Sequence, residues 1–493
     1  MTSHLHVDPY LLGGAVLLAI GIVLGGLARR LRVPGLLLFL GLGMLVGDDG
    51  LALVRFDDAQ LAQTVAVIAL VVILFEGGLA APRSDLRRVL APAALLATVG
   101  VVVTASVVAL SAAWLFHLPG TTVWLMGAVV ASTDAAATFS VLRGLPLPRR
   151  LGALLEVESG ANDPMAALLT VGILEAWQGN ASVANVVVFG VRQVGGGLLA
   201  GVVVGVLGVR LLRAIRLPSA SAVAVLATAL AGVAYGLAAV VGASGFLAVY
   251  VAGVIVGGRL PRHQVTIRSF DEGLAHIAQI VLFFLLGLLV FPSDLPGVAG
   301  RGLLVAAVLV FVARPLAVAV CLPWFGFRRR ELVLAAWAGL RGAVPIVLAT
   351  FPLTEGYPQG DQIFDVVFFV VLVSTALQGI TVAPLAQRLH LSSEPEATGA
   401  LAEIVPVETL AADVVQLELT SCSGLIGHTL AERPPPEGAR VAVLVRGKES
   451  LVPDGETPLH VGDVLVLAVP PGGSTEDLVT WASAPDRLDP MPT

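Results

Sequence analysis

Long apolar stretches separated by short polar loops recur along the chain up to about residue 392. A helix that crosses a bilayer needs about 20 mostly apolar residues, so the pattern predicts thirteen spanning helices, the second and ninth of them short. The predicted segments are 10–28, 34–48, 62–80, 90–115, 121–143, 152–176, 184–212, 219–241, 244–258, 273–291, 301–322, 331–353 and 363–387.

The arginines indicate which loops face the cytoplasm, because positively charged loops resist translocation. With the N-terminus outside, the loops after the odd-numbered segments carry nineteen arginines, against two (Arg55 and Arg301) in the outside loops. The pattern therefore predicts a multi-pass membrane protein with its N-terminus outside and its C-terminus in the cytoplasm.

The fifth and twelfth segments both contain helix-weakening residues, at 131–134 and 339–345. A shift of seven segments pairs these two and inverts their orientation, and interrupted helices at matching positions of two inverted halves are typical of transport sites. We therefore expect residues 1–392 to form an all-α membrane domain, built as two inverted six-helix repeats with interrupted helices.

Composition and charge separate this block from the end of the chain. Hydrophobic residues make up 57% of the sequence and charged residues 13%, about half the charged share of a soluble protein. Residues 393–493 instead carry 16 Asp and Glu against five Lys and Arg. A net charge of −6 argues against a nucleic-acid partner. With no catalytic grouping at one membrane depth, we expect neither an enzyme nor a cofactor.

The acidic end of the chain has a strand pattern of its own. Residues 403–472 contain alternating apolar runs at 414–420, 440–446 and 463–469, and a short helical pattern at 424–431. This order predicts a small cytoplasmic α+β domain. Residues 473–493 are expected to be a disordered tail.

Ionisable side chains inside the apolar segments are functional candidates, because a charge at membrane depth costs several kcal/mol unless it is paired or reaches water. The candidates are Glu76 in the third segment, Asp134 in the fifth, Glu156, Glu158 and Asp163 in the sixth, and Arg341 in the twelfth.

The sixth segment has the densest polar set. Ser159 and Asp163 are four residues apart and share a helix face, and Glu158 and Asn162 form a second such pair. Pro164 also leaves the carbonyl four residues earlier without its helical donor. These hard oxygen ligands suit a Group 1 cation. Because burial favours the protonated form of a carboxyl group, a cation and a proton can compete for Asp163.

Each candidate also has a structural interpretation. Glu76 could lie at a helix end near the membrane interface, and Asp134 could stabilise broken helix ends instead of binding an ion. Glu158 and Arg341 are expected to form a structural ion pair across the two halves. For Asp163 the alternative is a hydrogen bond between helices.

The chain resembles bacterial cation/proton antiporters of the NhaP type, which are related to the animal sodium/proton exchangers. The resemblance covers about residues 8–392 and rests on four stretches in the family's order and spacing: Phe-Glu-Gly-Gly at 75–78, Ser-Thr-Asp-Ala-Ala at 132–136, Glu-Ser-Gly-Ala-Asn-Asp-Pro at 158–164 and Gly-Leu-Arg-Gly-Ala at 339–343. It implies a homodimeric antiporter that works by an elevator-like movement of a six-helix core.

The resemblance also implies a role for each candidate. Asp163 would take either the proton or the monovalent cation, with Ser159, Glu76 and the backbone of Thr133 completing the ion's ligands. Asn162 would support the site, and its pairing with Asp163 is the form found in electroneutral members, which implies one proton per cation.

Three further residues have structural roles in the resembling family. Asp134 would stabilise the crossing of the interrupted helices, and Glu158 would pair with Arg341.

The acidic end resembles a TrkA-C domain, the C-terminal half of the cytoplasmic regulators of potassium transport. The strand–helix–strand order, residues 440–446 and the turn at 462–463 carry this resemblance. It implies regulation by a small-molecule ligand, although a role only in folding or dimerisation stays open. The sequence has no glycine-rich nucleotide motif after a strand in this region.

The identity of the cation depends on this tail. In similar proteins of the CvrA type, an antiporter with a TrkA-C tail exchanges potassium, so potassium is favoured and sodium is the alternative. A potassium channel with a regulatory tail is a less favoured hypothesis, because the sequence has no TVGYG-like filter.

Overall fold

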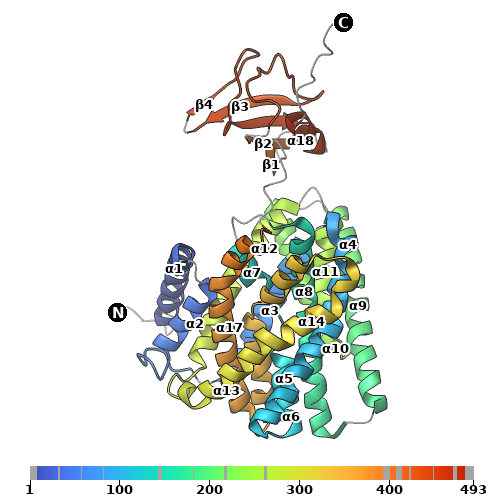
Figure 1. The fold of residues 1–493 in the computed structure, drawn as a ribbon. Helices are drawn as coiled ribbons and strands as arrows, with labels where there is room; N and C mark the ends of the chain where they lie inside the picture. Colours follow the sequence, from blue (N-terminus) through green and yellow to red (C-terminus); the bar gives the residue numbers. More distant parts are fainter. Residues whose placement is uncertain are drawn as a thin grey trace. The chain divides into compact units, whose positions relative to one another are not determined.

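The computed structural model describes residues 8–31, 34–56, 58–81, 83–142, 147–180, 183–215, 219–259, 264–391, 400–406, 413–420, 423–447, 449–469 and 475–483. The chain divides into two compact units, Met1–Ser392 and Ser393–Thr493, and Figure 1 shows that the first is helical and the second contains a sheet.

The first half of the helical unit follows the apolar pattern of the sequence. A π-helical turn, Leu96–Gly100, joins α4 to α5, so that the two form one continuous element. The helices are α1 (Asp8–Leu31), α2 (Gly35–Val46), α3 (Ala59–Ala80), α4 (Arg83–Leu95), α5 (Val101–Phe116), α6 (Gly120–Val129), α7 (Ala135–Leu142), α8 (Arg149–Glu175) and α9 (Val183–Ala214).

The second half repeats the same features. A π-helical turn, Leu309–Ala313, joins α13 to α14, and a break separates α15 from α16 as another separates α6 from α7. The helices are α10 (Ala220–Val240), α11 (Gly245–Arg259), α12 (Gln264–Leu288), α13 (Leu295–Val308), α14 (Arg314–Cys321), α15 (Arg329–Trp337), α16 (Ala343–Thr354) and α17 (Gly360–Arg388).

The lengths and hydropathy of these helices are those of a multi-pass membrane protein. Within the described part of the chain, seven helical stretches are long and apolar enough to cross a bilayer, and five further apolar helices are shorter. The expectation of a mostly helical membrane unit is therefore confirmed. The thirteen-span topology and the inverted repeat stay predictions.

Glycines allow two pairs of helices to approach closely. A Cβ atom at Gly201 of α9 would lie 2.6 Å from the carbonyl oxygen of Ala248 on α11, and one at Gly253 of α11 would lie 2.6 Å from that of Phe75 on α3. Small residues are typical of such close backbone packing in membranes. Phe75, which precedes Glu76 on α3, is thus held close to α11.

The second unit is a five-stranded antiparallel sheet with strand order β1-β2-β5-β3-β4. Leu417, Leu444 and Leu465 are fully buried in its core. Its elements are β1 (Ala400–Pro406), β2 (Asp413–Leu419), β3 (Arg440–Arg446), β4 (Glu449–Leu451), β5 (Val464–Val469) and α18 (Thr475–Ser483).

Two local predictions for this unit are wrong. The helix expected at 424–431 is a series of turns, because Gly427 has a left-handed φ of 81° and its N–H binds the carbonyl of Leu459 instead of a helical one. The tail expected to be disordered from residue 473 contains α18, which buries Leu478 and Ala482 in the core of the sheet unit. Residues 484–493 lie outside the described residues.

Candidate functional site

The breaks in two interrupted helices meet inside the helical unit. Residues 130–134 separate α6 from α7, and residues 338–342 separate α15 from α16. The backbone N–H of Asp134 donates to the carbonyl of Leu340 at 2.8 Å, and Oγ1 of Thr138 donates to that of Ala338 at 2.8 Å. Buried backbone groups need such partners, so each break supplies polar groups that the other one satisfies.

Arg341 stabilises this meeting point. Its side chain is 1% exposed and donates to the carbonyl oxygens of Ala131, at 2.9 Å, and Ser132. Its own carbonyl accepts a hydrogen bond of 2.5 Å from Oγ1 of Thr375 on α17. The guanidinium thereby replaces the N–H donors that the interruption removed from the first break.

Asp134 lies at the end of the first break, directly before α7. Its Oδ1 accepts from the backbone N–H of Ala137 at 3.0 Å, as a capping residue does at a helix N-terminus. A Cβ atom at Gly342 would overlap the Asp134 carboxylate. A glycine is therefore required where the second break passes this side chain.

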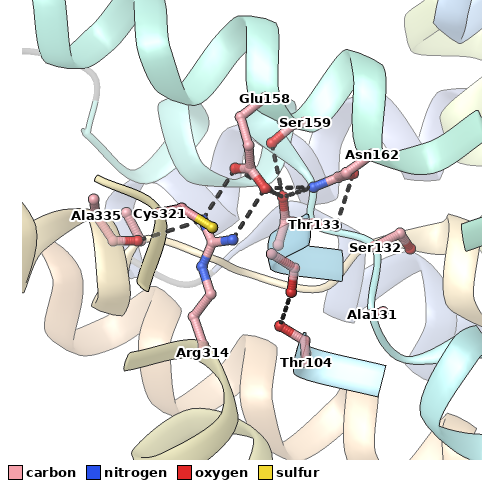
Figure 2. A network of polar contacts seen from close by, with 12 residues as sticks. Thr104, Ala131, Ser132, Thr133, Glu158, Ser159, Asn162, Arg314, Cys321 and Ala335 are labelled. Atoms are coloured by element: carbon pink, nitrogen blue, oxygen red, sulfur yellow. Dashed lines mark hydrogen bonds and ion pairs between the residues drawn. The ribbon is translucent and has the colours of Figure 1, made fainter. Parts of the chain in front are cut away.

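A buried polar network joins the first break to α8, as Figure 2 shows. Nδ2 of Asn162 donates to Oγ1 of Thr133 at 2.6 Å and to Oε1 of Glu158 at 2.7 Å, and Oδ1 of Asn162 accepts from the Thr133 N–H at 3.2 Å. The hydroxyl groups of Thr133 and Ser159 are 3.0 Å apart. Four predicted site residues are thus in direct contact.

The ion pair of Glu158 differs from the sequence prediction. Both carboxylate oxygens of Glu158 accept from Arg314 on α14, each at 3.0 Å, and the two side chains are 1% and 3% exposed (Figure 2). Arg341 was expected in this position but binds the carbonyl groups of the first break. The physical reason is that those carbonyl oxygens have lost their helical donors, whereas Arg314 enters from the side facing Glu158.

Arg314 is the functional residue that sequence reasoning missed. It follows the apolar run Leu309–Ala313 and precedes a proline. A lone arginine in an apolar segment is the same signal that identified Arg341, so a complete list of intramembrane charges would have contained it.

Asp163 follows Asn162 on α8, one turn after Ser159. It interacts electrostatically with Asp134, Glu158 and Arg341. Its Oδ1 is buried and has no hydrogen-bond partner among the described residues. A buried carboxylate oxygen without a hydrogen-bond partner can take a proton or coordinate a small cation.

Glu76 lies in a different group of charges. It interacts electrostatically with Arg268, Asp271 and Glu272 of α12, and Glu156 of α8 interacts with Glu76 and Arg268. Within the described residues, no hydrogen bond or ion pair joins Glu76 to the polar network around Asn162. That Glu76 binds the cation remains a prediction.

Comparison with known proteins identifies the helical unit. Residues 15–388 match the family model "Sodium/hydrogen exchanger, transmembrane", and residues 414–476 match the TrkA-C domain model.

Several curated proteins are similar over most of the chain. The "K(+)/H(+) antiporter NhaP2" of Shewanella sp. (strain ANA-3) is 38% identical over 469 residues, which cover 94% of this chain and 81% of the relative. The "K(+)/H(+) antiporter NhaP" of Alkalimonas amylolytica is 40% identical over 463 residues, covering 92% and 80%. The "Na(+)/H(+) antiporter NhaP" of Pseudomonas aeruginosa is 31% identical over 360 residues, covering 68% and 82%.

A solved structure has the same fold over the membrane part. The sodium proton antiporter MjNhaP1 from Methanocaldococcus jannaschii superposes with a TM-score of 0.69 at 25% sequence identity, covering 79% of this chain and 100% of that one. With the family match over most of its length, the crossed interrupted helices and the buried polar network, the chain belongs to the sodium/hydrogen exchanger family and carries a TrkA-C domain at its C-terminal end.

Proposed function

We propose that this protein is a secondary antiporter that exchanges a monovalent cation, with potassium favoured, for protons across the bacterial cytoplasmic membrane. The observation that carries this proposal is the buried Oδ1 of Asp163, which has no hydrogen-bond partner within the described part of the chain and belongs to the residue that follows Asn162 of the Thr133–Ser159–Asn162 network on α8. The names of the two potassium relatives support the choice of cation.

The mechanism is a competition for one carboxylate. Protonated Asp163 is neutral, and the ionised form binds the cation together with the hydroxyl oxygen of Ser159 and the backbone of Thr133. Because the two substrates exclude one another, the site carries either a proton or a cation as it is exposed to one side and then the other. Glu76 is the remaining proposed ligand.

The surrounding groups fix this site in place. Asn162 orients the Thr133 hydroxyl and backbone, Asp134 and Arg341 maintain the crossing of the interrupted helices, and the Glu158–Arg314 pair anchors Asn162. Fixed, pre-oriented groups discriminate between ions better than mobile ones.

We extend the proposal to the whole protein on the basis of the family. It comprises two inverted six-helix repeats within thirteen spans over residues 1–392, an outside N-terminus and a homodimeric assembly. It also assigns residues 403–472 to a cytoplasmic regulatory domain that responds to a small-molecule ligand.

The test uses purified protein in liposomes that contain a pH-sensitive dye under an imposed proton gradient. Potassium, sodium and choline are added in turn to the wild type and to Asp163→Asn. We expect potassium to discharge the gradient with the wild type, and the variant to behave like empty liposomes although it is folded and inserted. Asp361→Asn, which changes an exposed carboxylate at the start of α17, is the matched control and should exchange normally.

The outcomes separate the hypotheses. A larger response to sodium than to potassium would keep the mechanism and replace the cation, as the name of the Pseudomonas relative suggests. Cation flux that is not coupled to protons would favour a channel. Normal exchange by Asp163→Asn would exclude the proposed site.

A further inference from the structure

A second buried carboxyl group lies outside the Asp163 network. Asp271, about two turns into α12, is 0% exposed. Its Oδ1 lies 2.7 Å from Oγ1 of Thr228 on α10, and its Oδ2 is buried without a hydrogen-bond partner among the described residues. The mechanism proposed above makes no use of this group.

The hydroxyl group of Thr228 has two oxygen atoms within hydrogen-bond distance, on Asp271 and on Ala224. Oγ1 of Thr228 is also 3.1 Å from the carbonyl oxygen of Ala224, four residues earlier, which is the usual acceptor of a threonine in a helix. A hydroxyl group has one hydrogen to donate and can also accept. When Thr228 donates to Ala224, the short contact with Asp271 is a hydrogen bond donated by a protonated carboxyl group.

No basic group within the described residues forms an ion pair with Asp271. Arg268, one turn earlier on α12, interacts with Glu76 of α3 and Glu156 of α8, whereas no ion pair of Asp271 is found within the described residues. The other ionisable groups near this end of α12 are Glu272 and Glu76, which are both acidic. An ionised Asp271 would therefore be an unpaired buried charge, which is costly.

The remaining helices that pack on α12 do not change this balance. The sequences of α2 and α16 contain no ionisable residue, and α10 contains only Tyr235, two turns beyond Thr228. Arg29 and Arg30, at the C-terminal end of α1, lie on a helix that packs against a different face of α12. Gly21 of α1 approaches Ile280, which is nine residues from Asp271 and so about 180° around the helix at roughly 100° per residue.

We propose that Asp271 is a second proton-binding site: its carboxyl group is protonated on Oδ1 and donates to Thr228, which joins α10 to α12. Raising the pH removes this proton, leaves an unpaired negative charge between the two helices and weakens their contact. In the exchanger this gives a pH-dependent contact that is separate from the transport carboxylate; only this last step rests on the proposed function.

Infrared spectroscopy tests the proposal without any measurement of transport. Spectra of the full chain are recorded at pH 7 in a detergent without ester groups, and Asp163→Asn serves as the background so that the transport carboxyl does not contribute. We expect Asp271→Asn to remove one band of a protonated carboxyl group. Glu272→Gln, which changes the adjacent and exposed acid, should instead remove the bands of an ionised carboxylate.

A second variant keeps both carboxyl groups and tests the partner. Thr228→Val removes the acceptor, so the protonated-carboxyl band of Asp271 should move to higher frequency. Loss of ionised carboxylate bands in Asp271→Asn, or an unchanged spectrum in Thr228→Val, would overturn the proposal. Detection of the predicted bands in a protein that exchanges no cation would overturn the proposed function and leave this proton site standing.

Discussion

Glu158 accepts hydrogen bonds from Arg314, Asn162 and Thr133, so its charge is compensated from three sides. At the scale of single residues, this ion pair has the largest predicted effect on stability. Glu158→Gln leaves Arg314 buried without a counter-charge, and removal of one partner of a buried pair costs about 3–5 kcal/mol. Arg314→Met should cost a similar amount, whereas the double variant should recover most of the loss.

The free energy of unfolding in detergent, measured for the four members of this double-mutant cycle, checks the prediction. Arg329→Gln, an exposed arginine at the start of α15, is the control and should stay within about 0.5 kcal/mol of the wild type. Additive losses in the cycle would mean that the two side chains do not depend on one another.

The sheet unit contains a buried carboxyl group, that of Asp463, which favours its ionised form. Asp271, by contrast, is proposed to be protonated. Burial raises the pKa of Asp463, but the hydrogen bonds from Arg446 and from the backbone N–H of His460 outweigh it and lower the pKa below its ordinary value of 3.8. Ionised Asp463 therefore stabilises the unit above that ordinary value, and the contribution is lost as the pH falls through the lowered pKa.

We expect Asp463→Asn to reduce hydrogen-exchange protection in β3 and β5 at pH 7, because Arg446 loses its partner. The difference from the wild type should shrink as the pH is lowered below 3.8, after correction for the intrinsic exchange rate at each pH. Asp454→Asn, in an exposed turn, is the control. A difference that grows on acidification would contradict this account.

At the scale of elements, the crossing of the two interrupted helices should tolerate larger side chains least. Gly342→Ala places a methyl group on the Asp134 carboxylate, so we expect loss of exchange and a lower folded yield. Gly232→Ala in α10 is the matched control, since no atom lies within 4 Å of its Cβ position. Replacing a glycine inside a helix stabilises it by about 0.5–1 kcal/mol, so this variant should exchange normally. Exchange by Gly342→Ala at the wild-type rate would show that the close approach is unnecessary.

Patterns within one element could be predicted from the sequence, and contacts between elements could not. The positions of the broken helices follow from glycine and polar residues inside apolar segments, and the contact between Glu158 and Asn162 follows from their helical spacing. The partner of Glu158 depends on how α14 approaches α8, which no local pattern encodes. The turns at 424–431 likewise depend on a hydrogen bond to Leu459, far along the sequence.

At the scale of the whole molecule, the two compact units should be separable in function. Deletion of residues 393–493 removes the sheet unit at the boundary between the units. We expect the truncated protein to insert and to exchange cations, with a changed response to pH or to a ligand of the TrkA-C domain. The liposome assay over a range of pH checks this. Loss of all exchange from a correctly inserted truncation would mean that the sheet unit is part of the transport machinery.

The charges buried around the crossing have a consequence for the ion that the site accepts. Three carboxyl groups and two guanidinium groups interact electrostatically around Asp163, those of Asp134, Glu158, Asp163, Arg314 and Arg341, and together they carry an excess of one negative charge when all three carboxyl groups are ionised. One proton or one monovalent cation cancels that excess, whereas a divalent cation leaves a positive charge in a medium that penalises it. On the mechanism proposed here, the two arginines would thus set the valence of the cargo. One proton would then be exchanged for one cation, and we expect the exchange to respond to concentration gradients and to be insensitive to the membrane voltage.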